Sequence, residues 1–228
     1  MIHPFTVSIH IPKTAGTTVA EVFSRAKQRR ILYDYEGYEN PRTPSSLIRS
    51  NVDFITQYFH LLHGHFYASK YLDVFPNAHF ISTIRHPVDR VISQYMHEFN
   101  EHSNTALFHE AIKLGTLDVV EFAEQPGIGN AFSLHLAGRP LNEYDLILLS
   151  ERLLESLSIY SVCIDNLQLQ ANFGLPVQLP SLNLGHSRAN RLEFDDKTRT
   201  AIFERTHPDN EIYKEASALL DVKIKKYL

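Results

Sequence analysis

The 228-residue sequence has a single cysteine, no excess of positive charge and no long apolar segment. Cys163 has no second cysteine to pair with, so nothing in the chain indicates an oxidising compartment. A net charge of −4 argues against nonspecific nucleic-acid binding, which needs a dense cationic surface to neutralise phosphates. No segment approaches the roughly 18 consecutive apolar residues that span a bilayer, and the first residues lack the pattern of a secretion signal. We therefore expect a cytoplasmic protein.

What the chain does contain is the composition and pattern of an α/β protein. Apolar residues form 43% of it and charged residues 21%, and the length suits one domain over residues 1–228. Short apolar strands are predicted at residues 6–11, 79–84 and 145–149. Helices are predicted to begin after them, near residues 17, 87 and 153. This alternation predicts a central parallel sheet with helices on both faces.

The remaining segments are predicted from their turn residues and from the periodicity of their apolar residues. Residues 33–46 mix glycine, proline, asparagine and tyrosine without periodicity, which predicts an exposed loop. So long a loop is either a connector or a lid over the substrate. Residues 171–190 are also predicted to be a loop. Further helices are predicted at residues 47–62, 106–114, 117–124, 196–205 and 208–220.

A loop rich in hydroxyl residues, Pro12-Lys13-Thr14-Ala15-Gly16-Thr17-Thr18, joins the first predicted strand to the first predicted helix. Such a loop presents backbone N–H groups and the positive end of the helix dipole beyond the sheet edge. Lys13 adds a full charge, Gly16 permits close backbone approach and the threonines supply hydroxyl donors. These features indicate an anion site, although threonines also cap ordinary helices. The kinase-type loop G-x-x-x-x-G-K-[ST] is absent.

Two further segments hold candidate functional residues. Arg85 follows the second predicted strand and Ser93 lies on the next helix, and a guanidinium group binds phosphate oxygens in a two-pronged manner. Between the two loops, His63-Gly64-His65-Phe66 supplies imidazoles, whose ordinary pKa of about 6.5 suits a general base. Together with His60 the same histidines could instead bind a metal ion. No cysteine or acidic cluster stands nearby in the sequence to complete a metal shell.

Taken together, these motifs resemble the sulfotransferases that use 3′-phosphoadenosine 5′-phosphosulfate. The loop at residues 12–18 is similar to that family's 5′-phosphosulfate loop, and residues 80–87 with Ser93 are similar to its 3′-phosphate motif. The family commonly has aspartate in place of His86. The segment at residues 63–66 resembles the heparan and chondroitin 2-O-sulfotransferase branch.

The resemblance implies a P-loop-like sulfotransferase fold and transfer of a sulfuryl group to a hydroxyl of a carbohydrate or small-metabolite acceptor. The product would be adenosine 3′,5′-bisphosphate, and no metal is required. The branch resembled acts in the secretory pathway behind a membrane anchor. Since no anchor or disulfide is evident, we expect a bacterial-type cytoplasmic enzyme.

The resemblance also implies residue roles. His65 would take the proton from the acceptor hydroxyl with support from His63, and Lys13 would neutralise charge on the bridging and leaving oxygens. The residues implied to bind the donor are Lys13, Thr14, Ala15, Gly16, Thr17, Thr18, Arg85, Ser93 and, in a later loop, Ser187 and Arg188.

Other segments follow the family less closely. Residues 130–138 are similar to a family segment N-x-x-T-R-x-L-A-G, but Ser133 and Leu134 replace its threonine and arginine. Two other function classes stay open at this point. One is a nucleotide-dependent kinase, which would use the same strand-loop-helix geometry, and the other is a metal-binding protein or hydrolase built on the histidines.

Overall fold

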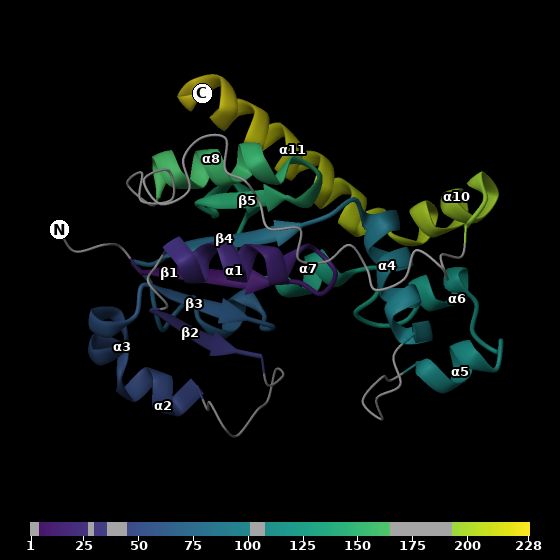
Figure 1. Cartoon of the computed structure of the whole chain (residues 1–228), viewed down its shortest axis with the longest axis horizontal. Coiled ribbons are helices and arrows are strands. Elements are labelled where there is room, and N and C mark those ends of the chain that lie inside the picture. Colours follow the sequence, from purple (N-terminus) through teal and green to yellow (C-terminus); the bar gives the residue numbers. More distant parts are fainter. Residues whose placement is uncertain (1–4, 27–29, 36–44, 101–107, 165–192) are drawn as a thin grey trace.

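The chain is described here by a computed structural model (Figure 1), which covers residues 5–26, 30–35, 45–100, 108–164 and 193–228. Ser187 and Arg188 lie outside these residues, as do the loop predicted at residues 171–190 and most of the loop predicted at residues 33–46.

A five-stranded parallel sheet forms the centre of the structure, in the order β2-β3-β1-β4-β5. The strands are β1 (Thr6–His10), β2 (Ile31–Asp34), β3 (Leu61–Gly64), β4 (His79–Ile84) and β5 (Leu146–Leu149). The α/β class, the parallel sheet and the three predicted strands are confirmed. Two strands were not predicted: β2 begins before the predicted loop at residues 33–46 and ends in its first two residues, and β3 includes the end of the predicted helix at residues 47–62.

Most of the predicted helices are present. The predicted helix at residues 47–62 is wrong: it is two short helices that end at Tyr58, because Phe59 takes an extended conformation and leads into β3. The helices are α1 (Gly16–Ala26), α2 (Ser45–Ser50), α3 (Val52–Tyr58), α4 (Pro87–Asn100), α5 (His109–Lys113), α6 (Val119–Ala123), α7 (Ala131–His135), α8 (Leu153–Cys163), α10 (Asp196–Arg205) and α11 (His207–Tyr227). Helix α10 has the predicted bounds, α5 and α6 are shorter than predicted, and α11 extends beyond the predicted end to Tyr227. Single 3₁₀ turns lie at Ala68–Lys70, Leu141–Glu143 and Ser150–Arg152.

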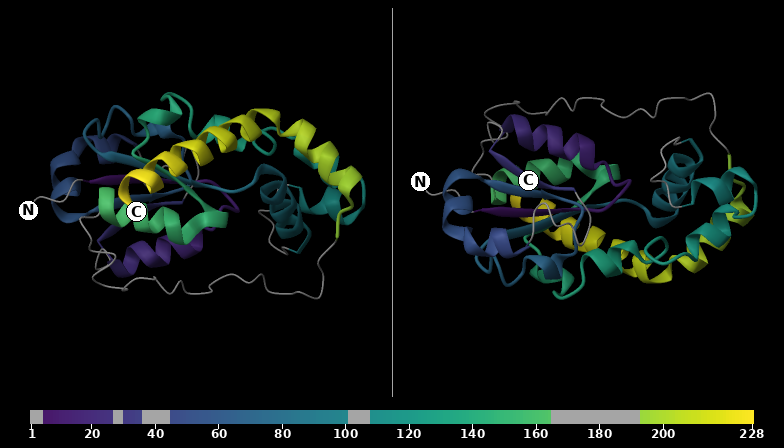
Figure 2. Two further views of the ribbon diagram at one scale, coloured as in Figure 1. Left: turned by 90° about the horizontal axis from the view of Figure 1, so that it is seen from above. Right: turned by 90° about the horizontal axis from the view of Figure 1, so that it is seen from below.

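The helices cover both faces of the sheet and also extend beyond one of its ends. Helices α1 and α8 lie on one face, whereas α2, α3 and α11 lie on the other (Figure 2). Helices α4, α5, α6 and α10 form a separate group past the carboxyl ends of the strands (Figure 1). Each region has its own apolar cluster: a large one around the sheet, and a smaller one that includes Val91, Phe122 and Ile202. Helix α11 runs from the helical group back over the sheet (Figure 1).

A buried polar junction ties α11 to the helices that follow β4. Asp209, in the first turn of α11, is buried, and its carboxylate accepts the backbone N–H groups of Phe132 and Ser133 in α7 at 3.0 to 3.1 Å. Arg90 of α4 is also buried and donates to the carbonyl of Ile128. Burial lowers the pKa of Arg90 to about 10, against the opposing attraction of Asp209. The junction therefore holds a buried carboxylate and a buried cation that favour each other's charge.

Replacing Asp209 should be far more costly than replacing an exposed carboxylate. Asp209→Ala leaves two buried N–H groups without their acceptor and Arg90 without its counter-charge, so we expect a loss of about 3–5 kcal/mol in the free energy of unfolding, measured in urea. The matched control is Asp221→Ala on the same helix, where an exposed carboxylate lies 2.6 Å from Arg152. That change should cost at most about 1 kcal/mol. Equal losses in the two variants would contradict this account of the junction.

Candidate functional site

Three of the sequence motifs leave the sheet from neighbouring strands. Strand β1 lies between β3 and β4, with Ile9 paired to Gly64 on one side and His10 paired to Thr83 on the other. The loop at residues 12–18 therefore emerges between the histidine segment and Arg85. Ligands of parallel α/β sheets bind at this carboxyl edge. The register thus brings together motifs that are some 20 to 70 residues apart in the sequence.

The loop at residues 12–18 has an unusual backbone. Lys13 and Ala15 both have left-handed conformations, with φ of 69° and 68°. Left-handed residues that alternate with ordinary ones turn successive N–H groups toward one concave side, which is an anion-binding arrangement. Strain of this kind is concentrated at functional sites. Thr14 is buried and its hydroxyl donates to the carbonyl of Ile11 at 2.8 Å, so this side chain braces the loop.

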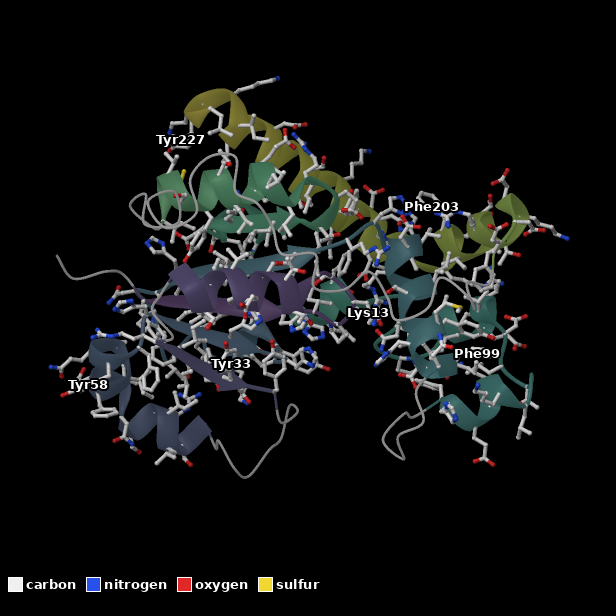
Figure 3. All side chains as sticks on the ribbon, viewed as in Figure 1. Lys13, Tyr33, Tyr58, Phe99, Phe203 and Tyr227 are labelled. Atoms are coloured by element: carbon white, nitrogen blue, oxygen red, sulfur yellow. The ribbon has the colours of Figure 1, made fainter. Side chains whose placement is uncertain are left out.

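Gly16, at the first position of α1, is required by a neighbouring side chain. A Cβ atom at this position would lie 1.7 Å from Nε2 of His10. The imidazole of His10 therefore occupies the space that any other residue at position 16 would need. Beyond it, Thr17 is exposed and Thr18 half-buried at the start of α1. Lys13 lies where the end of the sheet faces α4 (Figure 3).

Arg85 and Ser93 lie on the connection from β4 into α4. Arg85 directly follows β4 and is half-buried, and its guanidinium makes no hydrogen bond or ion pair with any residue that the structure describes. Ser93 is half-buried on α4. Neighbouring charges are paired, since Asp89 lies 2.7 Å from Arg199. A cation held in this way at the sheet edge has the properties of an anion-binding group.

The backbone of His86 is held by a carboxylate from another strand end. The N–H of His86 donates to Glu151 Oε1 at 2.7 Å, and its ring packs edge-on against Tyr213 with centroids 5.4 Å apart. A carboxylate from the β5 end thus accepts a backbone N–H at the start of α4.

The histidines of residues 63–66 belong to a larger cluster of rings. His63 is fully buried, with Nδ1 2.9 Å from the hydroxyl of Ser8. The Nε2 atom of His65 lies 3.1 Å from Nδ1 of His10, which in turn lies 3.1 Å from the hydroxyl of Tyr35. The rings of His10 and His63 are stacked, with centroids 5.3 Å apart. His63 and His65 are brought together as predicted, whereas His10 and Tyr35 were not predicted.

A sequence signal for His10 exists. In the first strand Thr6, Ser8 and His10 alternate with apolar residues, so the three polar side chains share one face of β1. Cross-strand pairing then sets Ser8 beside His63, which is itself paired with Tyr33 of β2. The prediction of a short apolar strand at residues 6–11 made no use of this alternation.

Backbone contacts fix the position of His65. Its N–H donates to the carbonyl of Asp34 at 2.9 Å. A Cβ at Gly64 would lie 1.7 Å from the same carbonyl oxygen, so only glycine fits between the two histidines. Asp34 is itself buried, and its Oδ2 accepts from Lys70 Nζ at 2.6 Å and from the Tyr71 hydroxyl at 2.7 Å. The end of β2 is thereby held rigidly beside the base candidate.

Burial keeps this cluster uncharged. Burial above all, together with the other imidazoles nearby, lowers the pKa of His63 to about 3 and that of His10 to about 2. Burial also lowers the pKa of His65. His135 of α7 joins the cluster, with Nδ1 3.2 Å from the carbonyl of Phe66, and burial lowers its pKa to about 4. Neutral imidazoles can accept protons, so the cluster is chemically suited to general-base work.

The metal alternative was built on His60 together with His63 and His65. His60 does not lie with them: it immediately precedes β3 and bonds through its backbone to Arg30 and Thr6, at the opposite end of the strand from His65. Within the part of the chain that the structure describes, no three His, Cys, Asp or Glu side chains are arranged to hold a metal ion.

The chain is similar to known proteins in sequence and in structure. A model described as "Sulfotransferase family" matches residues 11–122, a span that includes the loop at residues 12–18, the histidine segment, Arg85 and Ser93. The match supports the sulfotransferase family and does not distinguish the 2-O-sulfotransferase branch. The crystal structure of a sulfotransferase from Alicyclobacillus acidocaldarius is similar, with 14% identity and a TM-score of 0.47 over 100% of this chain and 98% of that one. No curated protein matches significantly. None of the described helices is both long and apolar enough to cross a membrane.

The buried histidines should make the fold sensitive to mild acid. In the unfolded chain they take up protons near their ordinary pKa of 6.5, whereas in the folded protein their pKa values are lower. The unfolded state therefore binds more protons, and the free energy of unfolding should fall as the pH drops below about 6.5. The slope is about 1.4 kcal/mol per pH unit for each histidine that stays neutral. Burial raises the pKa of Asp209 to about 6. Below this pH the folded state binds a proton at Asp209 that the unfolded state does not bind, which offsets the effect of one histidine.

Urea unfolding between pH 7.5 and 5.5 measures this slope. His63→Asn, which keeps a polar group near Ser8, should reduce the slope by about one proton. His207→Gln, which replaces an exposed histidine at the start of α11, should leave it unchanged. A stability that stays flat across this pH range in the unmodified protein would show that the cluster is not held neutral.

Proposed function

We propose that this protein transfers a sulfuryl group from 3′-phosphoadenosine 5′-phosphosulfate to a hydroxyl group of an acceptor. The observation that carries the proposal is the convergence of the loop at residues 12–18, Arg85 and His65 at the ends of three adjacent strands. The family match supports sulfuryl transfer in general. The donor, the base and the acceptor class are inferred from the site.

A donor with phosphates at two separate positions explains both cationic features. The concave loop and Lys13 would hold the 5′-phosphosulfate, together with backbone N–H groups from Thr14 to Thr18. Arg85 and Ser93 would hold the 3′-phosphate. A nucleoside triphosphate, the substrate of the kinase alternative, leaves Arg85 without a ligand. Ser187 and Arg188 stay predictions for further phosphate or adenine contacts.

The reaction follows from the positions of the neutral base and the cation. The acceptor oxygen attacks sulfur while the bond from sulfur to the bridging oxygen of the donor breaks, and adenosine 3′,5′-bisphosphate leaves. His65 accepts the proton of the acceptor hydroxyl, and Lys13 neutralises the charge that develops on the bridging and leaving oxygens. His63, stacked on His10, supports the base by fixing its surroundings. Alignment of the reacting groups supplies much of the rate.

The surface beside the histidines suits an acceptor with a ring. Tyr33 and Tyr35 are 44% and 39% exposed, and their rings stack with centroids 5.9 Å apart. The ring of Tyr35 lies 4.9 Å from that of His65. Aromatic rings with polar tips can pack against the apolar face of a sugar while their hydroxyls bind its polar groups. This pair, of which Tyr33 is marked in Figure 3, supports a carbohydrate or a small cyclic metabolite as the acceptor.

Loss of the Arg85 side chain should weaken product binding. Arg85→Ala is expected to reduce the affinity for adenosine 3′,5′-bisphosphate by about 1.5–3 kcal/mol, because a charge-assisted hydrogen bond to the 3′-phosphate is removed. Isothermal titration calorimetry measures the change. Arg49→Ala is the matched control, since Arg49 pairs with Asp73 on the exposed surface of α2 and should not alter the affinity. An unchanged affinity in Arg85→Ala would refute the 3′-phosphate assignment.

Loss of the base should affect turnover without affecting donor binding. His65→Ala is expected to lower turnover by about 10²- to 10⁴-fold, measured as release of bisphosphate with any hydroxyl acceptor that the unmodified protein uses. The affinity for the bisphosphate should change little. His207→Ala, at an exposed histidine, should retain full turnover. Full activity in His65→Ala would show that another group takes the proton.

A further inference from the structure

His10 lies between the proposed base and the proposed donor loop, and the mechanism above gives it no role. A single atom, Nδ1, lies 3.1 Å from Nε2 of His65 and 3.1 Å from the hydroxyl of Tyr35. Its other nitrogen, Nε2, lies against the α-carbon of Gly16 at the start of α1. The ring is therefore fixed on both sides, by the base candidate and by the anion loop.

We propose that His10 is a positioning residue that sets the tautomer of His65 and thereby selects Nδ1 of His65 as the atom that takes the acceptor's proton. This inference rests on the proposed function. In this arrangement His65 carries its hydrogen on Nε2 and donates it to Nδ1 of His10. The lone pair of His65 then resides on Nδ1, which no hydrogen bond occupies among the residues that the structure describes.

The opposite arrangement would disable His65 as a base. If Nδ1 of His10 carried the hydrogen and donated it to Nε2 of His65, the lone pair of His65 would already be engaged. A neutral imidazole has one donor and one acceptor nitrogen, so Nδ1 of His65 would then carry a hydrogen and could not accept another. Only the arrangement in which Nε2 of His65 donates to Nδ1 of His10 leaves His65 able to take the acceptor's proton directly.

The surroundings of His10 favour its role as an acceptor. Burial is the largest effect that lowers the pKa of His10, and His63, His65, His135 and Lys13 lower it further, so this ring stays neutral. Burial also raises the pKa of the Tyr35 hydroxyl, which therefore keeps its hydrogen, so the hydrogens of Tyr35 and His65 share the one lone pair of Nδ1. His10 then carries its own hydrogen on Nε2, at the start of α1.

The role resembles that of the third residue in hydrolytic triads, which orients the base and fixes its tautomer. There the orienting group is usually a carboxylate, whereas here it is a neutral imidazole. A neutral partner holds the ring in place without stabilising a charge on it as strongly as an anion would. His65 can therefore be oriented while its pKa stays below the ordinary value.

Two substitutions of His10 by side chains of similar shape distinguish its hydrogen bond to His65 from a role in packing alone. His10→Asn places an amide oxygen near the position of Nδ1 and can still accept from His65. His10→Leu has nearly the same shape and cannot accept. The first measurement is NMR of the ligand-free protein with ¹⁵N-labelled imidazoles, in which the His65 signals are identified by their loss in His65→Asn.

The NMR measurement needs neither donor nor acceptor. We expect Nε2 of His65 to carry the hydrogen in the unmodified protein and in His10→Asn, and to lose this single protonation state in His10→Leu. Finding the hydrogen on Nδ1 of His65 in the unmodified protein would overturn the proposal. So would a His65 tautomer that is unchanged in His10→Leu.

Kinetics give the second readout. His10→Leu should lower kcat by about 10- to 100-fold and shift the acidic limb of the pH–rate profile, with little change in bisphosphate affinity. His10→Asn should restore most of the turnover. Equal losses of kcat in the two variants would indicate a packing role and would overturn the proposal. A protein that binds no bisphosphate at all would instead contradict the proposed function, while the NMR result would still stand.

Discussion

The arrangement of the site depends on one constraint, the parallel pairing of β3, β1 and β4 with β1 in the middle. Parallel strands send their carboxyl ends to the same edge, so the chain that leaves β1 must pass between the chains that leave its two neighbours. The anion loop, the arginine and the base are therefore assembled by backbone hydrogen bonds. No side-chain contact between these groups is needed to bring them together, and each can be specialised for its own chemistry.

The carboxyl edge of the sheet contains strained and desolvated groups that lower the free energy of unfolding, and the rest of the fold offsets this loss. Lys13 and Ala15 have left-handed backbones, and neither Gly16 nor Gly64 has room for a Cβ atom. Four imidazoles are withdrawn from water beside them. Two apolar clusters and the buried junction at Asp209 supply the stability against which this strain and desolvation are set. Because α11 packs into the sheet cluster and its buried Asp209 meets α7 and Arg90 of α4, it also fixes the position of α4, which carries Ser93, relative to the sheet (Figure 1).

Much of this organisation could be predicted from the sequence, and the failures have physical causes. Strands β1, β4 and β5 are apolar runs bounded by turn residues, and α10 was predicted with its observed bounds. Strands β2 and β3 are as short as β5, but only the first two residues of each are aliphatic, so neither is recognised as an apolar run. Tyr35 and His135 meet the other rings only through strand register and the placement of α7, which local patterns do not encode. The steric requirement for glycine at position 16 could not be predicted either, because it depends on where the ring of His10 lies.

The central claim is that this edge binds a nucleotide with phosphates at two separate positions, and competitive calorimetry tests it most directly. The unmodified protein should be titrated with adenosine 3′,5′-bisphosphate, with adenosine 5′-monophosphate and with ATP in the presence of Mg²⁺. We expect the bisphosphate to bind at least about tenfold more tightly than either of the others, since only it engages both the loop and Arg85. Equal affinity for the bisphosphate and the monophosphate, or a preference for ATP with Mg²⁺, would contradict the account.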